Sequence, residues 1–279
     1  CFAGAWAQHV ADGNDTSLRL SDDDLDHALA GFLELRDPSG VDGGDDGAHG
    51  NAFDRVGAFQ DGLEGGARAC RDYATNPPEV TEAGFSSYAD AEVNGDLPLD
   101  EVLPMLETSL DDYWTATYSD YERTPKLTAT TGAPSCPSGS DRGVLSDSVL
   151  YCAATNTINY STQTLNKAEK TIGDLGAGVF VAAAWSSAVQ HQLGVKIGTA
   201  QARASAECLT GAWAGGVENG SAGTRKSRDL TFSPGDLDEV VATFVATDGS
   251  SSVNRGSVFT RVTLFRTGFE HGAKACFSA

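Results

Sequence analysis

Histidine side chains are the first candidates for metal binding in this sequence, because the neutral imidazole is the commonest metal ligand in proteins. A helix presents two imidazoles to one ion when they lie four residues apart, and none of the 5 histidines lies three or four residues from another. We therefore expect surface or loop positions for all of them rather than metal ligation. These residues are His9, His27, His49, His191 and His271.

Serine and carboxylate side chains offer other routes to catalysis, and neither has a diagnostic setting here. Ser186 and Ser187 lack the Gly-x-Ser-x-Gly context of a nucleophile elbow. The 39 Asp and Glu residues place some carboxylates near each other by chance, so a glycosidase-type pair is neither indicated nor excluded. The sequence also has no glycine-rich phosphate loop.

The cysteines mark the ends of an internal repeat. The segment CFAGAWA at 1–7 returns as CLTGAWA at 208–214, and the segment ending at Cys70 returns as one ending at Cys276, with half of the aligned positions identical. Self-similarity at a fixed long period indicates duplicated modules. One pairing lets both copies fold alike, and the alternative is six free thiols. The predicted disulfides are Cys1–Cys70, Cys136–Cys152 and Cys208–Cys276, which favour an oxidising compartment.

Composition excludes two classes of partner. The formal net charge of −20 repels phosphate backbones and anionic lipids, so we expect no nucleic-acid partner. The best apolar stretch, Leu175–Val189, is interrupted by Gly and Ser, so we expect no membrane span. No charged and apolar leader precedes Cys1 in this sequence. A mature lipoprotein would also begin with Cys, but Cys1 already has a repeat counterpart in Cys208.

Hydrophobic periodicity and turn-forming residues predict the helices and strands that hold these residues. Helices are expected over 1–10, 20–35, 52–66, 99–118, 173–194 and 198–215, and from Ser233. Strands are expected over 125–131, 149–152 and 156–161. Ser21 and Ser233 are predicted N-caps, and the acidic residues that follow them complement the helix dipole. The acidic loop Asp37–Gly47 could hold a weak surface calcium, but it misses the EF-hand spacing, so a solvated loop is favoured.

The order of these segments resembles the neutral zinc metallopeptidase family of bacterial secreted and membrane-anchored proteins. The resemblance rests on YCAATNTINY, AVQHQLG, SAECLTGAWA, SPGDLDEV and FTRVTLFRTGFEHGAKAC, and it covers residues 107–279. It implies an α+β fold. A zincin-like domain at 98–279, mainly helical with a small sheet, would follow a linker at 74–97. Residues 1–73 resemble only the C-terminal half of a second member, as a helical partial repeat.

Active members of that family bind zinc through two histidines on one helix and an acidic residue on the next, with a glutamate between the histidines as general base. The resemblance puts Ala183 and Ser187 at the histidine positions, Ala184 at the glutamate position and Arg203 at the acidic position. Methyl groups and a cation cannot ligate zinc, and a hydroxyl does not replace an imidazole. We therefore expect no zinc cofactor, although active relatives would carry one.

A shift of the register by one residue places Ala184, Trp185 and Ala188 at the motif and restores no ligand. Glu207 survives at a second acidic position, which in an active relative orients a ligand from outside. Its spacing from Arg203 suggests an i, i+4 ion pair. Trp185 is expected to fill the former cleft or line its floor.

These patterns favour a secreted, catalytically inactive metallopeptidase-like protein that binds a peptide, a cell-wall component or a protein partner. Two alternatives stay open. The chain could belong to a tandem zinc metallopeptidase whose active copy lies upstream of Cys1, or it could be a structural surface domain.

Overall fold

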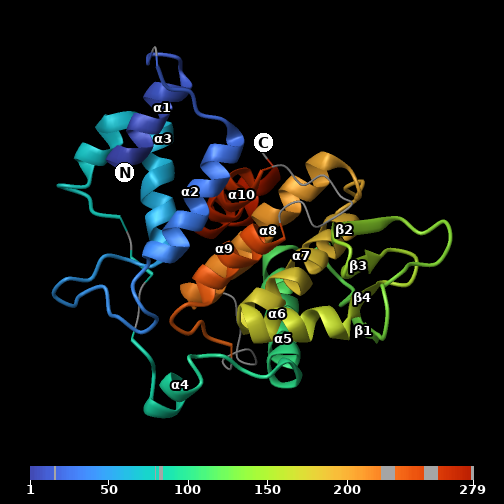
Figure 1. Cartoon of the computed structure of the whole chain (residues 1–279). Coiled ribbons are helices and arrows are strands. Elements are labelled where there is room, and N and C mark those ends of the chain that lie inside the picture. Colours follow the sequence, from blue (N-terminus) through green and yellow to red (C-terminus); the bar gives the residue numbers. More distant parts are fainter. Residues whose placement is uncertain (16, 79, 82–83, 221–229, 248–256, 278–279) are drawn as a thin grey trace. The chain divides into compact units, whose positions relative to one another are not determined.

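The computed structural model describes the chain except for residues 16, 79, 82–83, 221–229, 248–256 and 278–279 (Figure 1). Its helices and small sheet confirm the mixed α+β class. The contacts group the chain into two compact units. Unit 1 comprises residues 1–95, 233–245 and 257–259, and unit 2 comprises residues 96–232, 246–256 and 260–279.

Unit 1 is helical. Its elements are α1 (Phe2–Ala11), α2 (Asp22–Leu35), α3 (Ala52–Asp72), the short α4 (Tyr88–Glu92) inside the predicted linker, most of α9 (Asp236–Ala246) and the first residues of α10 (Val258–His271). Ser21 forms the predicted cap of α2 as a capping box with Asp24. The predicted end of α3 at residue 66 coincides with a kink, because Gly66 has φ +64°.

The α9 helix begins later than predicted. Ser233 was expected as the N-cap, but the helix starts at Asp236. The intervening Gly235 has φ +103°, a left-handed conformation that cannot belong to a right-handed helix. Ser233 lies in the preceding turn and donates its N–H to the Asp236 carboxylate, 2.9 Å away.

Two helices of unit 1 are capped by the opposite copy of the repeat. The Asp26 carboxylate, on α2, accepts hydrogen bonds from the N–H groups of Val258 (3.0 Å) and Phe259 (2.7 Å) at the start of α10. Its repeat counterpart Asp238, on α9, accepts one from the N–H of Phe53 (2.9 Å) at the start of α3. This exchange explains why unit 1 includes segments of the second copy.

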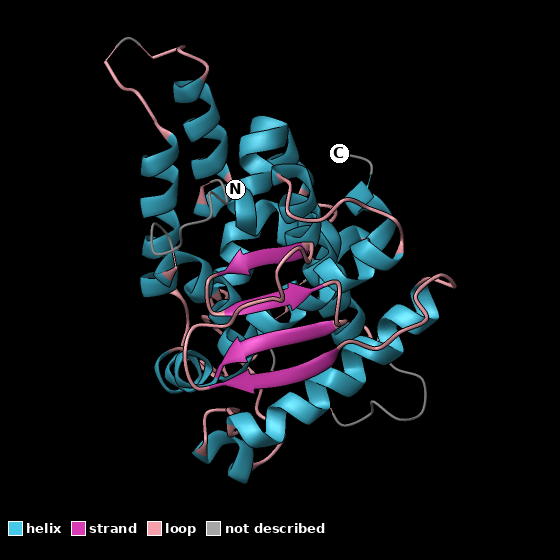
Figure 2. Ribbon diagram, turned by 90° about the vertical axis from the view of Figure 1, so that its right-hand side faces the viewer, coloured by secondary structure: helices cyan, strands magenta, loops and turns pink. Residues whose placement is uncertain are grey.

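Unit 2 contains the sheet and the longest buried helices. Its elements are α5 (Leu99–Thr117), β1 (Lys126–Thr130), β2 (Arg142–Ser146), β3 (Val149–Cys152), β4 (Thr157–Ser161), α6 (Thr162–Thr171), α7 (Asp174–Gln192), α8 (Ala200–Glu218), the rest of α10 and the 3-10 helix η1 (Ala273–Phe277). The strands form one sheet in the order β1-β4-β3-β2 (Figure 2). The β1–β4 pair is parallel, and the other two pairs are antiparallel. Helix α7 contacts β2, β3 and β4.

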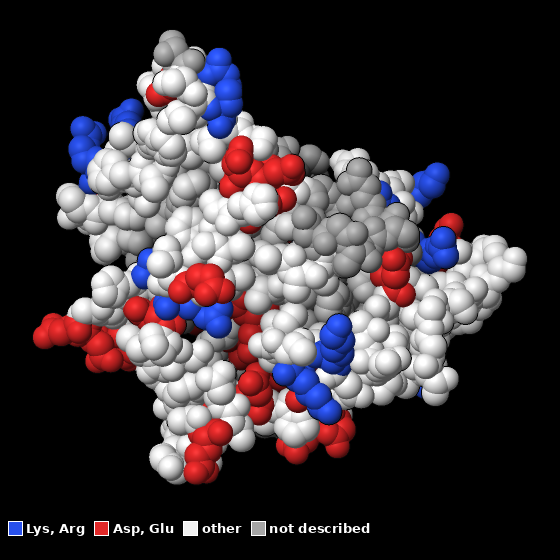
Figure 3. Space-filling view, in the orientation of Figure 1, with Lys and Arg blue, Asp and Glu red and all other residues white. Residues whose placement is uncertain are grey.

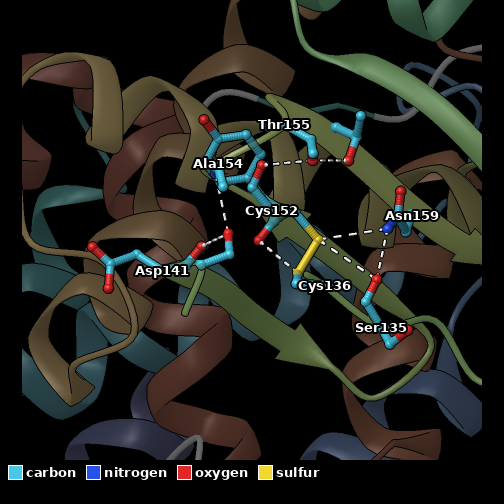
Figure 4. The surroundings of a disulfide bond; sticks show 10 residues. Ser135, Cys136, Asp141, Cys152, Ala154, Thr155 and Asn159 are labelled. Carbon is cyan, nitrogen blue, oxygen red and sulfur yellow. Dashed lines mark hydrogen bonds between the residues drawn. A yellow bond between two sulfur atoms is a disulfide. The ribbon is translucent and has the colours of Figure 1, made fainter. Parts of the chain in front are cut away.

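The three disulfides have the pairing that the repeat predicts: Cys1–Cys70, Cys136–Cys152 and Cys208–Cys276. The second of these joins the loop before β2 to the end of β3 (Figure 4). Beside it, the Asn159 side-chain amide donates to the Ser135 carbonyl over 2.8 Å. The Ala154 N–H donates to the Ser140 hydroxyl over 3.1 Å. These bonds fasten the loop to the sheet.

Close helix crossings explain the repeated glycines. A Cβ atom on Gly4 of α1 would lie 1.9 Å from the Phe59 carbonyl oxygen of α3, and one on Gly62 would lie 1.9 Å from the Cys1 carbonyl oxygen. The α8–α10 crossing repeats both contacts at the equivalent residues, because a Cβ on Gly211 or Gly268 would lie 1.8 Å from a carbonyl oxygen. Only glycine permits either crossing.

Candidate functional site

Helix α7 carries the positions that the resemblance assigns to zinc binding. It is apolar on all sides, and every residue from Asp174 to Gln190 except Phe180 is buried. A helix without a polar face lies in the interior of a domain. Ala183 packs against Ala206 of α8, and small side chains at both positions let the two backbones approach closely. Helices α7 and α8 therefore pack directly against each other beside Ala183.

The space beside Ser187 is filled by the edge strand β2. A Cβ atom added to Gly143 would lie 2.2 Å from the Ser187 Cβ, so the strand's backbone rests directly on this side chain. The Ser187 hydroxyl donates to the Ala183 carbonyl one turn earlier, over 3.4 Å. A larger side chain at position 187 would collide with the sheet.

Arg203 and Glu207 do not form the predicted ion pair. The Glu207 carboxylate instead lies 2.9 Å from Nε of Arg261 on α10, and the two residues are 2% and 3% exposed. The Arg203 guanidinium donates from Nη1 to the Gly198 carbonyl over 2.8 Å. Glu207 therefore stabilises the α8–α10 pair and faces a cation other than the one that the local spacing suggested.

Trp185 is fully buried and is held by a chain of hydrogen bonds. Its indole Nε1 donates to the Tyr121 hydroxyl over 2.9 Å. That hydroxyl donates to the Asp111 carboxylate over 3.0 Å, and the Thr124 hydroxyl donates to the same oxygen over 2.6 Å. Burial raises the pKa of the Tyr121 phenol, and the Asp111 charge raises it further. The phenol therefore stays protonated and serves as a fixed donor.

Two further polar residues between α7 and α8, Gln190 and Thr210, were not singled out by sequence reasoning. The Gln190 amide, 1% exposed, donates to the Ala202 carbonyl over 2.9 Å. The Ser186 and Thr210 hydroxyls lie 3.2 Å apart. An isolated polar residue within an apolar helix gives no sequence pattern from which its hydrogen-bond partner could be predicted. Arg261 did carry one, because it recurs in the first copy as Arg55.

The set of donors in this region does not suit zinc. A zinc site requires imidazole, thiolate or carboxylate ligands around the ion. The family positions on α7 offer methyl groups and a hydroxyl that is bonded to its own helix, and Arg203 offers a cation. Glu207, the carboxylate in this set, is bonded to Arg261.

Unit 1 holds a separate, small pocket that opens to solvent. It is lined by the loop at 37–41, by Asn51 and Thr81, and by the turn before α9. The nearby carboxylates already have partners. The Asp37 carboxylate accepts the N–H groups of His49 and Gly50, and Asp238 lies 3.5 Å from the Arg36 guanidinium. This explains the loop as a self-bonded turn, and a bound calcium is not needed to hold it.

Comparison with protein-family models, with curated proteins and with solved structures gives no match. The resemblance to zinc metallopeptidases therefore rests on the residues of this chain alone.

Proposed function

We propose that this chain is a catalytically inactive, metallopeptidase-like protein that acts by binding a peptide, a cell-wall component or a protein partner. The observation that carries the proposal is the contact between Gly143 and Ser187. Strand β2 occupies the place beside the α7 motif position where a zinc ligand and its ion would require space.

Charge and hydrogen bonding support the same conclusion. Arg203 places a cation at the position of the acidic ligand, and the Glu207 carboxylate, at the second acidic position, is ion-paired with Arg261. Ala183, Ser187 and Arg203 could not hold a metal ion, and Ala184 offers no general base to activate a water molecule.

Secretion is part of the proposal. Three disulfides stabilise proteins in oxidising compartments. Among the described residues, no helix combines the length and the apolar character needed to cross a bilayer. Acidic side chains form several clusters on the face seen in Figure 3, which agrees with a partner that is not a polyanion.

Metal analysis tests the proposal directly. The purified full chain should contain far less than one zinc per molecule, and it should leave casein uncleaved both with and without added zinc. A chelator-treated sample provides the matched baseline. One tightly held zinc per chain, removed by chelator together with casein cleavage, would contradict the proposal. Co-sedimentation with purified peptidoglycan then separates a cell-wall ligand from a peptide or protein partner.

A further inference from the structure

Helix α1 presents a large apolar face to solvent. Phe2 and Trp6 lie one turn apart and are 64% and 53% exposed. Residues at i and i+4 share one face of a helix, and Ala3 on the same face is also exposed. Exposed aromatic side chains that lie together commonly mark an interaction site.

The second copy of the repeat shows how such a face is covered. Leu209 and Trp213 of α8, the counterparts of Phe2 and Trp6, are 0% and 1% exposed. Helices α5 and α7 pack against α8, and the Phe232 ring lies edge-on to the Trp213 indole. The Trp213 indole donates to the Ser109 hydroxyl of α5 over 3.1 Å, and Thr210 meets Ser186 of α7. In this copy the face is a packed, uncharged interface.

The scaffold behind the two faces is the same. Helix α1 crosses α3 through the same glycine contacts that join α8 to α10, and a disulfide closes each pair. The copies therefore differ in what covers the helix rather than in how the helix is held. The equivalent arginines of the two copies also have different partners. Arg261 forms an ion pair with Glu207, the residue before Cys208, whereas Nε of Arg55 donates to the Gly50 carbonyl.

We propose that the outer face of α1 docks a helix pair of the α5–α7 kind, supplied by a second module homologous to residues 96–207. The match is chemical: an uncharged face with an indole donor meets small residues and serine hydroxyl acceptors such as Ser109. His9 stands where α8 has Gly216, so the docked pair must leave room for an imidazole at that end. This inference does not depend on whether the α7 site is catalytic.

A fusion chain tests the docking. Residues 96–207 are placed directly before Cys1 of the full chain, so that a second Glu207 precedes Cys1 as the first precedes Cys208. Trp114, Trp185 and Trp213 are at most 1% exposed, so acrylamide quenching in the native chain reports mainly on Trp6. The Trp6→Phe variant isolates its signal by difference. Docking is expected to reduce the quenching of Trp6 several-fold and to add the helical circular dichroism of the fused segment.

A matched pair of surface variants separates docking from a general effect. Trp6→Asp should lower the melting temperature of the fusion chain while leaving that of the native chain unchanged. Tyr88→Asp provides the control, because Tyr88 is 80% exposed on α4 and has no counterpart in the repeat. It should change neither chain.

Three results would overturn the inference. The first is a Trp6 that stays as quenchable in the fusion chain as in the native chain. The second is a fused segment that gains no helical signal, since α1 and α3 would then fail to provide the surface that α8 and α10 provide. The third is a native chain that forms a dimer which Trp6→Asp abolishes, because the occupant would then be a second copy.

Discussion

The buried pair of Glu207 and Arg261 gives the sharpest prediction about stability. Replacing Glu207 with Ala removes the carboxylate that lies 2.9 Å from Nε of Arg261 and leaves the guanidinium in a site that is only 3% exposed. A hydrogen bond to a charged group contributes about 1.5–3 kcal/mol. Breaking one partner of a buried ion pair costs about 3–5 kcal/mol, because the remaining charge is uncompensated. Since Nη1 of Arg261 also contacts the Thr247 hydroxyl at 3.4 Å, we expect the lower end of that range.

The repeat supplies a matched control. Arg55 occupies the equivalent place on α3, is half-buried and donates to a neutral carbonyl. Arg55→Met should therefore cost about 1 kcal/mol, the contribution of an ordinary hydrogen bond. Arg261→Met should cost more, because it strands the Glu207 carboxylate.

Urea unfolding followed by tryptophan fluorescence and circular dichroism measures these differences in the free energy of unfolding. A double-mutant cycle with Glu207→Ala and Arg261→Met should show that the double variant is more stable than the two single losses imply, because neither member of the ion pair then remains in its buried site without the other. A cost below about 1 kcal/mol for Glu207→Ala, or strictly additive losses, would refute the reasoning.

Three further predictions concern other sites. Ser187→His should destabilise the chain by about 1–3 kcal/mol or more through overpacking against Gly143, and thermal unfolding beside the harmless Ser187→Ala variant checks this. Burial, with a smaller contribution from the Asp96 charge, raises the pKa of Asp174 from 3.8 to about 6. The native state therefore loses stability as pH rises from about 4 to 6, so Asp174→Asn should be more stable than the native chain above pH 6, by up to ~3 kcal/mol, and should lose this advantage toward pH 4 in urea titrations. Asp26→Ala and Asp238→Ala should each cost about 1 kcal/mol in urea unfolding, because each removes the cap of a helix in the other copy; no loss in either would show that the caps are dispensable.

Local rules accounted for most of the secondary structure. Helical periodicity located α5 and α7 to within two residues at each end, since both are long and have strong boundary signals. The three predicted strands fall within one residue of β1, β3 and β4. Strand β2 was missed because it contains Gly143 and lies between turn-forming Ser and Asp residues. Its place next to α7 depends on tertiary packing.

The details of the site escaped prediction for a different reason. An i, i+4 spacing made Arg203 the nearest cation to Glu207 in sequence, yet Arg261, 54 residues away, takes the carboxylate. Spacing along a helix shows only which side chains are near each other on that helix. The buried interface between α8 and α10 determines which cation is buried beside the Glu207 carboxylate. The recurrence of this arginine as Arg55 was the available signal. Likewise, Gly235 determines where α9 begins through its positive φ, which composition alone does not reveal.

The two tryptophans of the repeat separate what a local sequence specifies from what its surroundings specify. Trp6 and Trp213 stand in the same Gly-Ala-Trp-Ala context, on helices held by equivalent glycine crossings and disulfides. Trp6 is half exposed, and Trp213 is buried. The repeat thus encodes the helix pair and its crossing, while the surroundings of α8, among them α5, α7 and the Phe232 ring, account for the burial of Trp213. The exposed Trp6 indole lacks the hydrophobic stabilisation that burial gives to Trp213. Covering that face with a homologous helix pair would recover this stabilisation without any change in the helices beneath it.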